Sequence, residues 1–430
     1  MMTIRVKDRD AVIQALRAGV VPRTCQHLIQ VGRVREVEAM IRDLDRIAEG
    51  GSGFRLVIGE YGAGKTFFLN LVRSIALEKK LVTMHADLNP GRRLYASGGQ
   101  ARSLYSELAK NMATRTRPDG NALPGVVERF VNEAMTSAQA TGKKPEVAIQ
   151  ERLTSLTDMV GGYDFANVIA AYCRGFLEGN EVLKSDAIRW LRGEFSTKTD
   201  ARTALDVRSI IDDDAIYDHL KLLARFIRLS GFTGLLICLD EMVNLYKLSN
   251  APARNGNYEQ ILRILNDSLQ GSAEGLGFIL GGTPEFLFDS RRGLYSYAAL
   301  QSRLAENTFA RGGLQDFTGP VLRLSSLTPE DFYVLLQKLR DLQACGDPKQ
   351  YLLPDEALSA YMQHAAKRLG ESYFRTPRTT IKAFLDLLAV LEQNPGVDWH
   401  PLVGTVDIPQ DMGGDNDKAP VDDELASFRL

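Results

Sequence analysis

Residues 54–66 read FRLVIGEYGAGKT, an apolar run followed by a glycine-punctuated loop that ends in a lysine and a threonine. The segment from Gly59 to Thr66 matches the phosphate-binding pattern GxxxxGK[ST], and FFLNLVRSIALEKK (67–80) predicts an amphipathic helix directly after it. Strand, loop and helix in this order are the context that the motif requires, whereas the alternative is a plain glycine-rich turn. The stretch therefore predicts a phosphate-binding loop between a buried strand and a helix.

Each residue type in this loop has a physical reason to be there. Glycines let the backbone wrap so that its N–H groups face the phosphates, Lys65 neutralises the β and γ oxygens, and the Thr66 hydroxyl ligates Mg²⁺. The residues that we expect to contact the nucleotide are Gly59, Glu60, Tyr61, Gly62, Ala63, Gly64, Lys65, Thr66 and Phe67.

Two carboxylates follow a second apolar run in LLICLDE (235–241). A phosphate-binding loop needs an acidic group at the end of a neighbouring strand, so Asp240 is expected to hold Mg²⁺ through its water shell. Glu241 is the expected base that orients and deprotonates the attacking water. The alternative is a core strand that ends in a solvated acidic pair. Because kinases for small molecules more often lack the second acid, Glu241 favours hydrolysis of the nucleotide.

Strand-like and helical segments alternate along much of the chain. This pattern predicts an α/β fold with a parallel sheet, because successive parallel strands need helical crossovers. The apolar runs that predict strands lie at 54–59, 81–88, 232–240, 276–282 and 320–324.

The same pattern predicts the division of the chain into parts. Residues 1–50 are expected to form a helical approach segment, and 51–325 the core that binds the nucleotide. Within that core, 90–215 loses the strand signal and is interpreted as a large helical insertion. A helical lid domain is expected at 326–403, followed by an acidic tail at 404–430 that is disordered or binds a partner.

Composition excludes several classes of protein. The chain has 430 residues and a formal net charge of -2, which excludes a uniformly basic nucleic-acid clamp. The 4 cysteines form no CxxC pair and the 5 histidines form no HxxxH pair, so no metal site beyond Mg²⁺ is expected. No apolar run reaches the roughly 18 residues of a membrane helix, and the N-terminus lacks the apolar stretch of a signal peptide. We expect a cytoplasmic protein without a membrane partner.

Three further residues are candidate catalytic groups. Thr283 follows the run LGFILGG, and its hydroxyl would face the γ-phosphate if that strand lies between the other two; the alternative is a threonine that caps the next helix. Arg303 in ALQSRLAENTF and Arg378 in TPRTTIKAFLDLL are similar to the arginine-finger box and the sensor 2 helix of AAA+ ATPases. Such arginines stabilise charge on the transferring phosphoryl group. The rival arginines are Arg291, Arg292 and Arg375.

With its motifs in this order, the chain resembles the AAA+/STAND P-loop ATPases of the Orc/Cdc6-like branch. Gly32 and Arg33 are similar to the segment by which that group packs against adenine, which implies ATP as the cofactor and Arg33 as a further binding residue. More narrowly, VIQALRAGVVPRT, VIGEYGAGKTFFL, LDEMVNL, GGTPEFL and TPRTTIKAFL look like the ATP-binding proteins of bacterial BREX-type phage-defence clusters. The resemblance covers roughly residues 11–400, and no winged-helix domain is evident after the lid.

The resemblance implies an ATP hydrolase that needs Mg²⁺ and assembles as a homo-oligomer. Its implied partners are other proteins of a defence cluster that modify or process DNA, and DNA itself is a candidate partner. The alternative function is a slow nucleotide-dependent switch or scaffold that times the assembly of partner proteins without acting on DNA.

Two stretches offer surface to a partner or to nucleic acid. The first interleaves basic and aromatic residues from Gly91 to Tyr95, with Tyr105 on the helix behind it. The second is the Asn/Gly-rich stretch from Ser249 to Asn257, interpreted as a polar loop. A solvated surface and ordinary helix amphipathicity are the alternatives.

Overall fold

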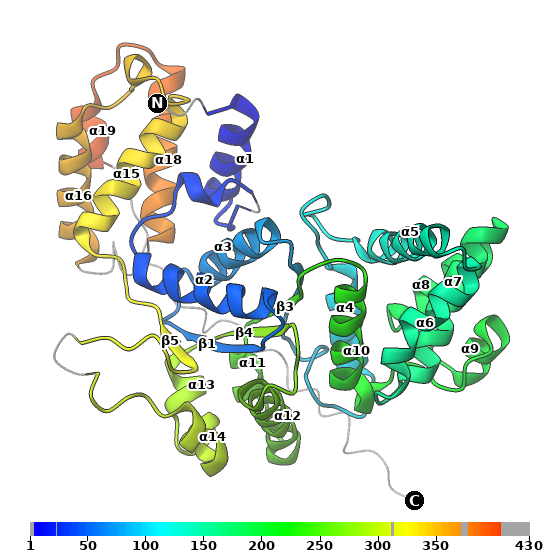
Figure 1. Cartoon of the computed structure of the whole chain (residues 1–430). Coiled ribbons are helices and arrows are strands. Elements are labelled where there is room, and N and C mark those ends of the chain that lie inside the picture. Colours follow the sequence, from blue (N-terminus) through cyan, green and yellow to red (C-terminus); the bar gives the residue numbers. More distant parts are fainter. Residues whose placement is uncertain (1–3, 23, 311–313, 371–376, 406–430) are drawn as a thin grey trace, which may run out of the picture. The chain divides into compact units, whose positions relative to one another are not determined.

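The computed structural model describes residues 4–22, 24–310, 314–370 and 377–405 (Figure 1). The chain divides into two compact units. The smaller comprises the described parts of 1–32, 61–64 and 326–430, and the larger comprises those of 33–60 and 65–325.

A parallel sheet of five strands lies at the centre of the larger unit, in the order β2-β3-β4-β1-β5. Its strands are β1 (Gly53–Ile58), β2 (Val82–Asp87), β3 (Leu235–Asp240), β4 (Leu276–Gly282) and β5 (Val321–Arg323). Strands β1, β3 and β4 are buried along their whole length, as expected for a parallel sheet covered on both faces. The predicted α/β class and the parallel sheet are thereby confirmed.

The two faces of the sheet belong to different apolar cores because side chains alternate along each strand. In β3, Leu236 and Cys238 pack with α2 (Val34–Ala48) and α3 (Lys65–Glu78). Leu235, Ile237 and Leu239 of the same strand belong to the core on the opposite face. The helices that contribute to that second core include α4 (Gln100–Lys110), α10 (Ile216–Leu229) and α12 (Ala251–Gln270).

Short helices complete this part of the larger unit. Some of them follow the carboxyl ends of β3 and β4, and the others lie in the segments that connect longer helices and strands. Their bounds are α11 (Val243–Tyr246), α13 (Pro284–Phe288), α14 (Ala298–Leu304) and the 3-10 helices η2 (Asp213–Ala215) and η3 (Leu294–Ser296).

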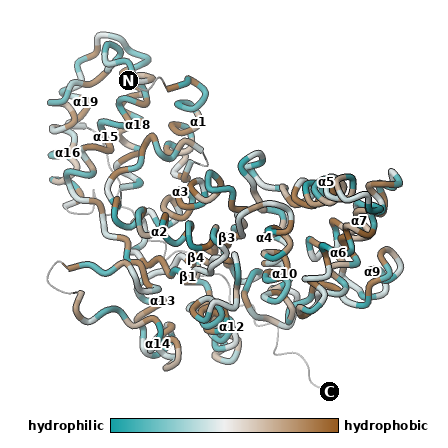
Figure 2. Tube along the Cα trace, in the orientation of Figure 1, coloured by the Kyte–Doolittle hydropathy of each residue, from teal (hydrophilic) through white to brown (hydrophobic). Residues whose placement is uncertain are grey.

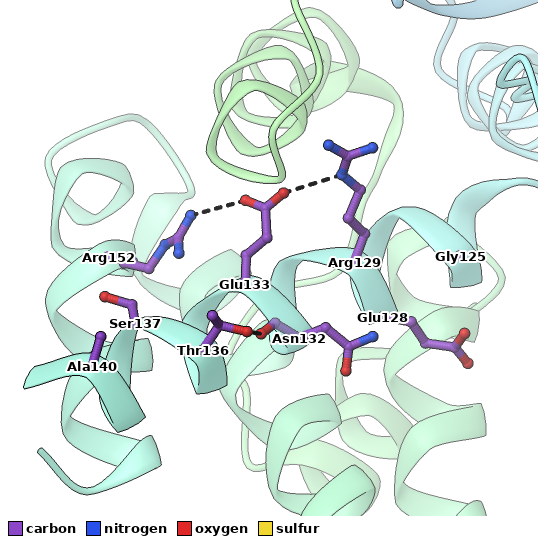
Figure 3. A pocket seen from close by; sticks show the side chains of 9 residues that line it. All are labelled: Gly125, Glu128, Arg129, Asn132, Glu133, Thr136, Ser137, Ala140 and Arg152. Carbon is purple, nitrogen blue, oxygen red and sulfur yellow. Dashed lines mark hydrogen bonds and ion pairs between the residues drawn. The ribbon is translucent and has the colours of Figure 1, made fainter. Parts of the chain in front are cut away.

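Five helices that lie between α4 and α10 in the sequence pack together. They are α5 (Leu123–Thr141), α6 (Pro145–Thr157), α7 (Gly162–Glu178), α8 (Glu181–Leu191) and α9 (Lys198–Leu205). Their core is aromatic: the Phe165 ring meets those of Trp190 and Phe226 edge to face, with centroids 6.3 Å and 5.8 Å apart. On the surface, Glu133 of α5 pairs with both Arg129 and Arg152 (Figure 3).

The smaller unit is helical in the part that the structure describes. Its elements are α1 (Val6–Arg17), α15 (Pro329–Gln343), α16 (Asp355–Leu369), α18 (Arg378–Gln393), α19 (Trp399–Thr405) and the 3-10 helices η1 (Gln26–Leu28) and η4 (Pro348–Gln350). Helix α1 packs on α18, where Arg17 and Asp386 form an ion pair of 2.9 Å. A capping box between Thr328 and Asp331 begins α15, at the start signal visible in the sequence.

Hydrophobic and hydrophilic residues alternate along the helices of both units, as expected of helices with one buried face (Figure 2). Among the residues described, no helix combines the length and the apolar character needed to cross a bilayer.

One buried ion pair in the larger unit allows a test of the fold. Asp43 of α2 pairs with Arg55 of β1, and each side chain is only 7% exposed. Removing Asp43 leaves the guanidinium buried without its carboxylate, so Asp43→Ala should lower the free energy of unfolding by about 3–5 kcal/mol. Asp45→Ala is the matched control on the same helix, because Asp45 is 49% exposed where it pairs with Lys79 and should cost less than about 1 kcal/mol. Chemical denaturation followed by circular dichroism measures both, and equal costs would contradict the buried pair.

Candidate nucleotide-binding site

The phosphate-binding loop connects β1 to α3, whose first residue is Lys65. Gly62 and Gly64 have φ of 77° and 78°, in the left-handed region that glycine enters without a steric cost. These two positions explain the glycines of the motif, because the chain must reverse tightly before the helix begins. The free N–H groups at the start of α3 then provide the partial positive charge that favours an anion.

Lys65 extends its ammonium group over the beginning of the loop. Its Nζ donates to the carbonyl oxygens of Gly59 at 2.8 Å and Glu60 at 2.9 Å. Burial lowers the pKa of Lys65, while the carboxylates of Asp240 and Glu241 act in the opposite direction. The ammonium group of Lys65 therefore interacts electrostatically with Asp240 and Glu241, the two acids predicted from the sequence.

Thr66 and Asp240 meet directly. The Thr66 hydroxyl donates to Asp240 Oδ2 at 2.6 Å, and the backbone N–H of Glu241 donates to Oδ1 of the same carboxylate at 2.9 Å. Asp240 is only 6% exposed. A Cβ at Gly281, on the adjacent strand β4, would lie 2.4 Å from Asp240 Oδ1, so the absence of a side chain there leaves room for the carboxylate.

Glu241 has an unusual backbone conformation for its residue type. Its φ is 57°, in the left-handed region, which costs free energy for a residue with a Cβ and often marks a functional site. The next residue, Met242, donates its N–H to the Gly281 carbonyl at 3.0 Å, which helps to hold the turn. Glu241 is exposed when the whole residue is considered, but its carboxyl group is partly shielded from water. Loss of hydration raises the pKa of Glu241, and the carboxylates of Asp240 and Asp87 raise it further.

Asp87 is an acid that the sequence analysis did not select. It ends β2 in register with Asp240 of β3, so a third carboxylate lies at the same edge of the sheet. Partial desolvation raises the pKa of Asp87, and Asp240 adds to this shift. The available signal was the strand-like run LVTMHADL (81–88), whose next-to-last residue is this acid.

The residues present fit a hydrated Mg²⁺ ion. Thr66 and Asp240 would hold it, since a hydroxyl and a carboxylate are oxygen ligands of the kind that Mg²⁺ prefers. No group of three or more His, Cys, Asp or Glu side chains in the described ranges could form a metal cage by itself. An ion that keeps several of its waters and binds few protein groups, as Mg²⁺ does, suits this site.

Thr283 caps a helix in this structure. Its hydroxyl accepts the N–H of Phe286 at 3.5 Å, at the start of α13, which is the capping alternative considered above. The strand before it, β4, does lie between β1 and β3. The role of Thr283 at a phosphate stays a prediction.

The candidate arginines have different environments. Arg303 is exposed on α14, and its guanidinium donates to the Ala299 carbonyl of the same helix at 3.0 Å. Its rival Arg292 donates to the carbonyls of Tyr246 and Leu248, each at 3.2 Å, so that guanidinium has partners within the chain. Arg291 is exposed, whereas Arg375 lies outside the described residues.

Two further arginines begin helices. Arg378 is the first residue of α18 in the smaller unit, where its guanidinium lies against Gly19. Arg33 precedes α2 with a φ of 57°, and its guanidinium donates to the Ser325 carbonyl at 3.3 Å. Their roles as sensor 2 and as a nucleotide contact remain predictions.

The family described as BREX system ATP-binding protein BrxC/D matches residues 4–407. The chain belongs to this family. The match confirms the resemblance to the BREX ATP-binding proteins drawn from the sequence, and with it the binding of ATP. No curated protein matches the chain.

Two predicted contact surfaces of this BREX ATP-binding protein need correction. For Tyr105 the structure favours the alternative, ordinary helix amphipathicity, over stacking, because its ring is fully buried and its hydroxyl donates to the Leu191 carbonyl at 3.0 Å. The polar loop from Ser249 to Asn257 is wrong, because Asn250 caps α12 and the helix begins at Ala251. Arg254, within that stretch, is only 9% exposed.

The Gly91 to Tyr95 stretch meets the same helix. Asn257 of α12 accepts the Tyr95 N–H at 2.9 Å and donates to the Tyr95 carbonyl at 3.0 Å. The stretches Gly91 to Tyr95 and Ser249 to Asn257, predicted as separate surfaces, are therefore hydrogen-bonded to each other through the Tyr95 backbone.

A substitution at Gly281 tests the geometry around Asp240. The methyl group of Gly281→Ala would clash with Oδ1 of Asp240 and shift the whole carboxylate, including the Oδ2 that accepts the Thr66 hydroxyl. Affinity for ATP with Mg²⁺ should therefore fall about tenfold or more. Calorimetric titration with and without Mg²⁺ measures this, and the loss should be larger with the ion present. Gly125→Ala is the control, since nothing lies within 4 Å of a Cβ there. Unchanged affinity in a folded Gly281→Ala protein would refute the assignment of Asp240.

Proposed function

We propose that this chain is a Mg²⁺-dependent ATPase of the AAA+ type that acts in BREX phage defence. It would work as a homo-oligomer with partner proteins that process or modify DNA. The observation that carries the proposal is the contact between Thr66 and Asp240, with the exposed residue Glu241 directly after Asp240. A candidate metal ligand thus ends the strand β3, and a candidate base follows it directly.

The chain's own residues divide the chemistry between them. Lys65 would shift its hydrogen bonds from its own loop carbonyls to the β and γ oxygens of ATP, and Thr66 and Asp240 would hold the ion. When bound, Mg²⁺ neutralises charge on the phosphates. Glu241 would accept the proton of the attacking water, and its raised pKa makes it a stronger base once it is ionised.

Several features support the AAA+ assignment. The sheet has β4 between β1, which precedes the phosphate loop, and β3, which ends in Asp240, and this is the condition under which Thr283 would face the γ-phosphate. Arg303 is exposed and has no acidic partner in the part of the chain that the structure describes, so it could reach a neighbouring subunit. The helices of 326–403 would be the lid, with Arg378 at the start of α18 as sensor 2.

The proposed base has a direct test. Glu241→Gln keeps the size of the side chain but cannot accept a proton, so ATP should bind with near-normal affinity while turnover falls at least about 100-fold. Lys65→Ala is the complementary variant, because loss of its charge should weaken ATP binding itself by about tenfold or more. Steady-state phosphate release and calorimetry measure the two quantities. Turnover of Glu241→Gln within a few-fold of the parent would place the base elsewhere.

The same turnover assay separates this function from the slow switch. Hydrolysis that DNA stimulates strongly favours an ATPase acting with DNA-processing partners. Slow hydrolysis that is indifferent to DNA but altered by a protein of the same gene cluster favours a switch or scaffold.

A mixing experiment tests whether Arg303 acts between subunits. Arg303→Ala should preserve ATP binding and folding but remove most hydrolysis, because the guanidinium stabilises charge only in the transition state. Mixing it with Glu241→Gln protein should restore activity, since an intact Glu241 in one subunit meets an intact Arg303 from the other. Arg291→Ala, the exposed rival, should retain turnover and serves as the matched control. Absence of rescue, or full activity of a strict monomer, would refute a role in trans.

A further inference from the structure

A cavity of about 590 Å³ lies among helices that follow α4 in the chain, and none of the residues that line it belongs to the candidate nucleotide-binding site. Its walls come from α6, α7, α9 and the segment that follows α9, elements that Figure 1 shows grouped together. The volume is within the range of small-molecule sites, about 300–1,000 Å³.

Three arginines line this cavity, and each comes from a different element. Arg174 belongs to α7, Arg202 belongs to α9, and Arg208 follows α9. All three are exposed, and their guanidinium groups form no hydrogen bond or ion pair with the residues that the structure describes. Their donors are thus free to bind an anion, and a guanidinium binds phosphate oxygens in a bidentate geometry.

Hydrogen bonds to a buried side chain hold the backbone at Arg208 in place. Asp164, only 8% exposed at the start of α7, accepts the backbone N–H groups of Arg208 at 3.2 Å and Ser209 at 2.8 Å. It also accepts the Ser209 hydroxyl at 2.5 Å. Asp206, which ends α9, has a φ of 54°, a costly conformation for a residue with a side chain. The segment is therefore fixed by a buried carboxylate.

The other lining groups narrow the class of ligand. Glu146, Glu178 and Asp206 are exposed acidic residues that line the same cavity, and the buried Asp164 is a fourth. Four carboxylates against three guanidinium groups disfavour a polyanion such as a DNA strand. Tyr163 at the start of α7 is 63% exposed and offers an aromatic face. The amide of Asn167 adds both a donor and an acceptor. These lining groups suit a ligand that carries an anion, hydrogen-bond donors and a flat ring.

We propose that this cavity is a second nucleotide site, separate from the phosphate-binding loop. The arginines would bind the phosphate, Tyr163 would stack on the base, and the carboxylates would accept hydrogen bonds from ribose hydroxyls or a base amino group. The site would give the insertion a function of its own, as the part of the chain that senses a nucleotide other than the one hydrolysed.

Calorimetric titration of the full chain with the 5′-mononucleotides AMP, GMP, CMP and UMP tests the proposal. At least one should bind saturably, and Arg202→Ala and Arg208→Ala should each weaken it about tenfold or more. Arg42→Ala, an exposed arginine of α2 without an ion pair in the described chain, is the matched control and should change nothing. Lys65→Ala should also leave this binding intact, so the outcome is independent of the proposed ATPase.

Inorganic phosphate and a short single-stranded oligonucleotide are the competing probes. Phosphate that binds as tightly as the mononucleotide would show a general anion site, and tighter binding of the oligonucleotide would show a nucleic-acid surface. Either result would overturn the assignment. So would an absence of saturable mononucleotide binding by the parent protein, or equal affinity in folded arginine variants, with folding checked by thermal melting.

Discussion

Parallel pairing is the constraint on which the candidate site depends. In a parallel sheet every strand ends at the same edge, so residues far apart in the sequence meet there without being neighbours in the chain. Asp87 and Asp240 are aligned by the register of β2 with β3, and Gly281 lies beside Asp240 because β4 is the next strand. The Thr66 hydroxyl reaches the same carboxylate from the first turn of α3.

Much of this site could be predicted from residue types and spacing, because the local chemistry is strict. A chain that binds phosphate through its backbone needs glycines at the positions of Gly62 and Gly64, and both adopt the positive φ that explains them. The strand that ends in Asp240 could be predicted from its continuous apolar run, since strands buried on both faces are mostly apolar. The left-handed conformation of Glu241 could not, because glutamate has no preference for that region.

The predictions that the structure does not support share one cause, which is that polar or aromatic composition does not show what a segment packs against. Asn and Gly around Ser249 to Asn257 are typical of a loop, yet Asn250 acts as a helix cap and Asn257 is fully buried against Tyr95. Tyr105 lies on the amphipathic helix α4, and the sequence alone does not show that its hydroxyl is inside the protein. Only the packing of α4 against α8, where the hydroxyl donates to the Leu191 carbonyl, shows this. Asp87 was overlooked for a related reason, because its importance depends on strand register.

The electrostatics of the sheet edge give a physical reason for a cation and a phosphate to bind there. Burial raises the pKa of both Asp87 and Glu241, and the negative charge of Asp240 raises each pKa further, so the three carboxylates repel one another in the protein alone. Lys65 opposes this effect at Glu241, but it is one ammonium group near several acids and burial lowers its own pKa. A divalent cation beside Asp240 would relieve the repulsion, and a phosphate would in turn favour the charged form of Lys65. Metal and nucleotide should therefore bind cooperatively, because the cation relieves the repulsion among the carboxylates and the phosphate stabilises the charged form of Lys65.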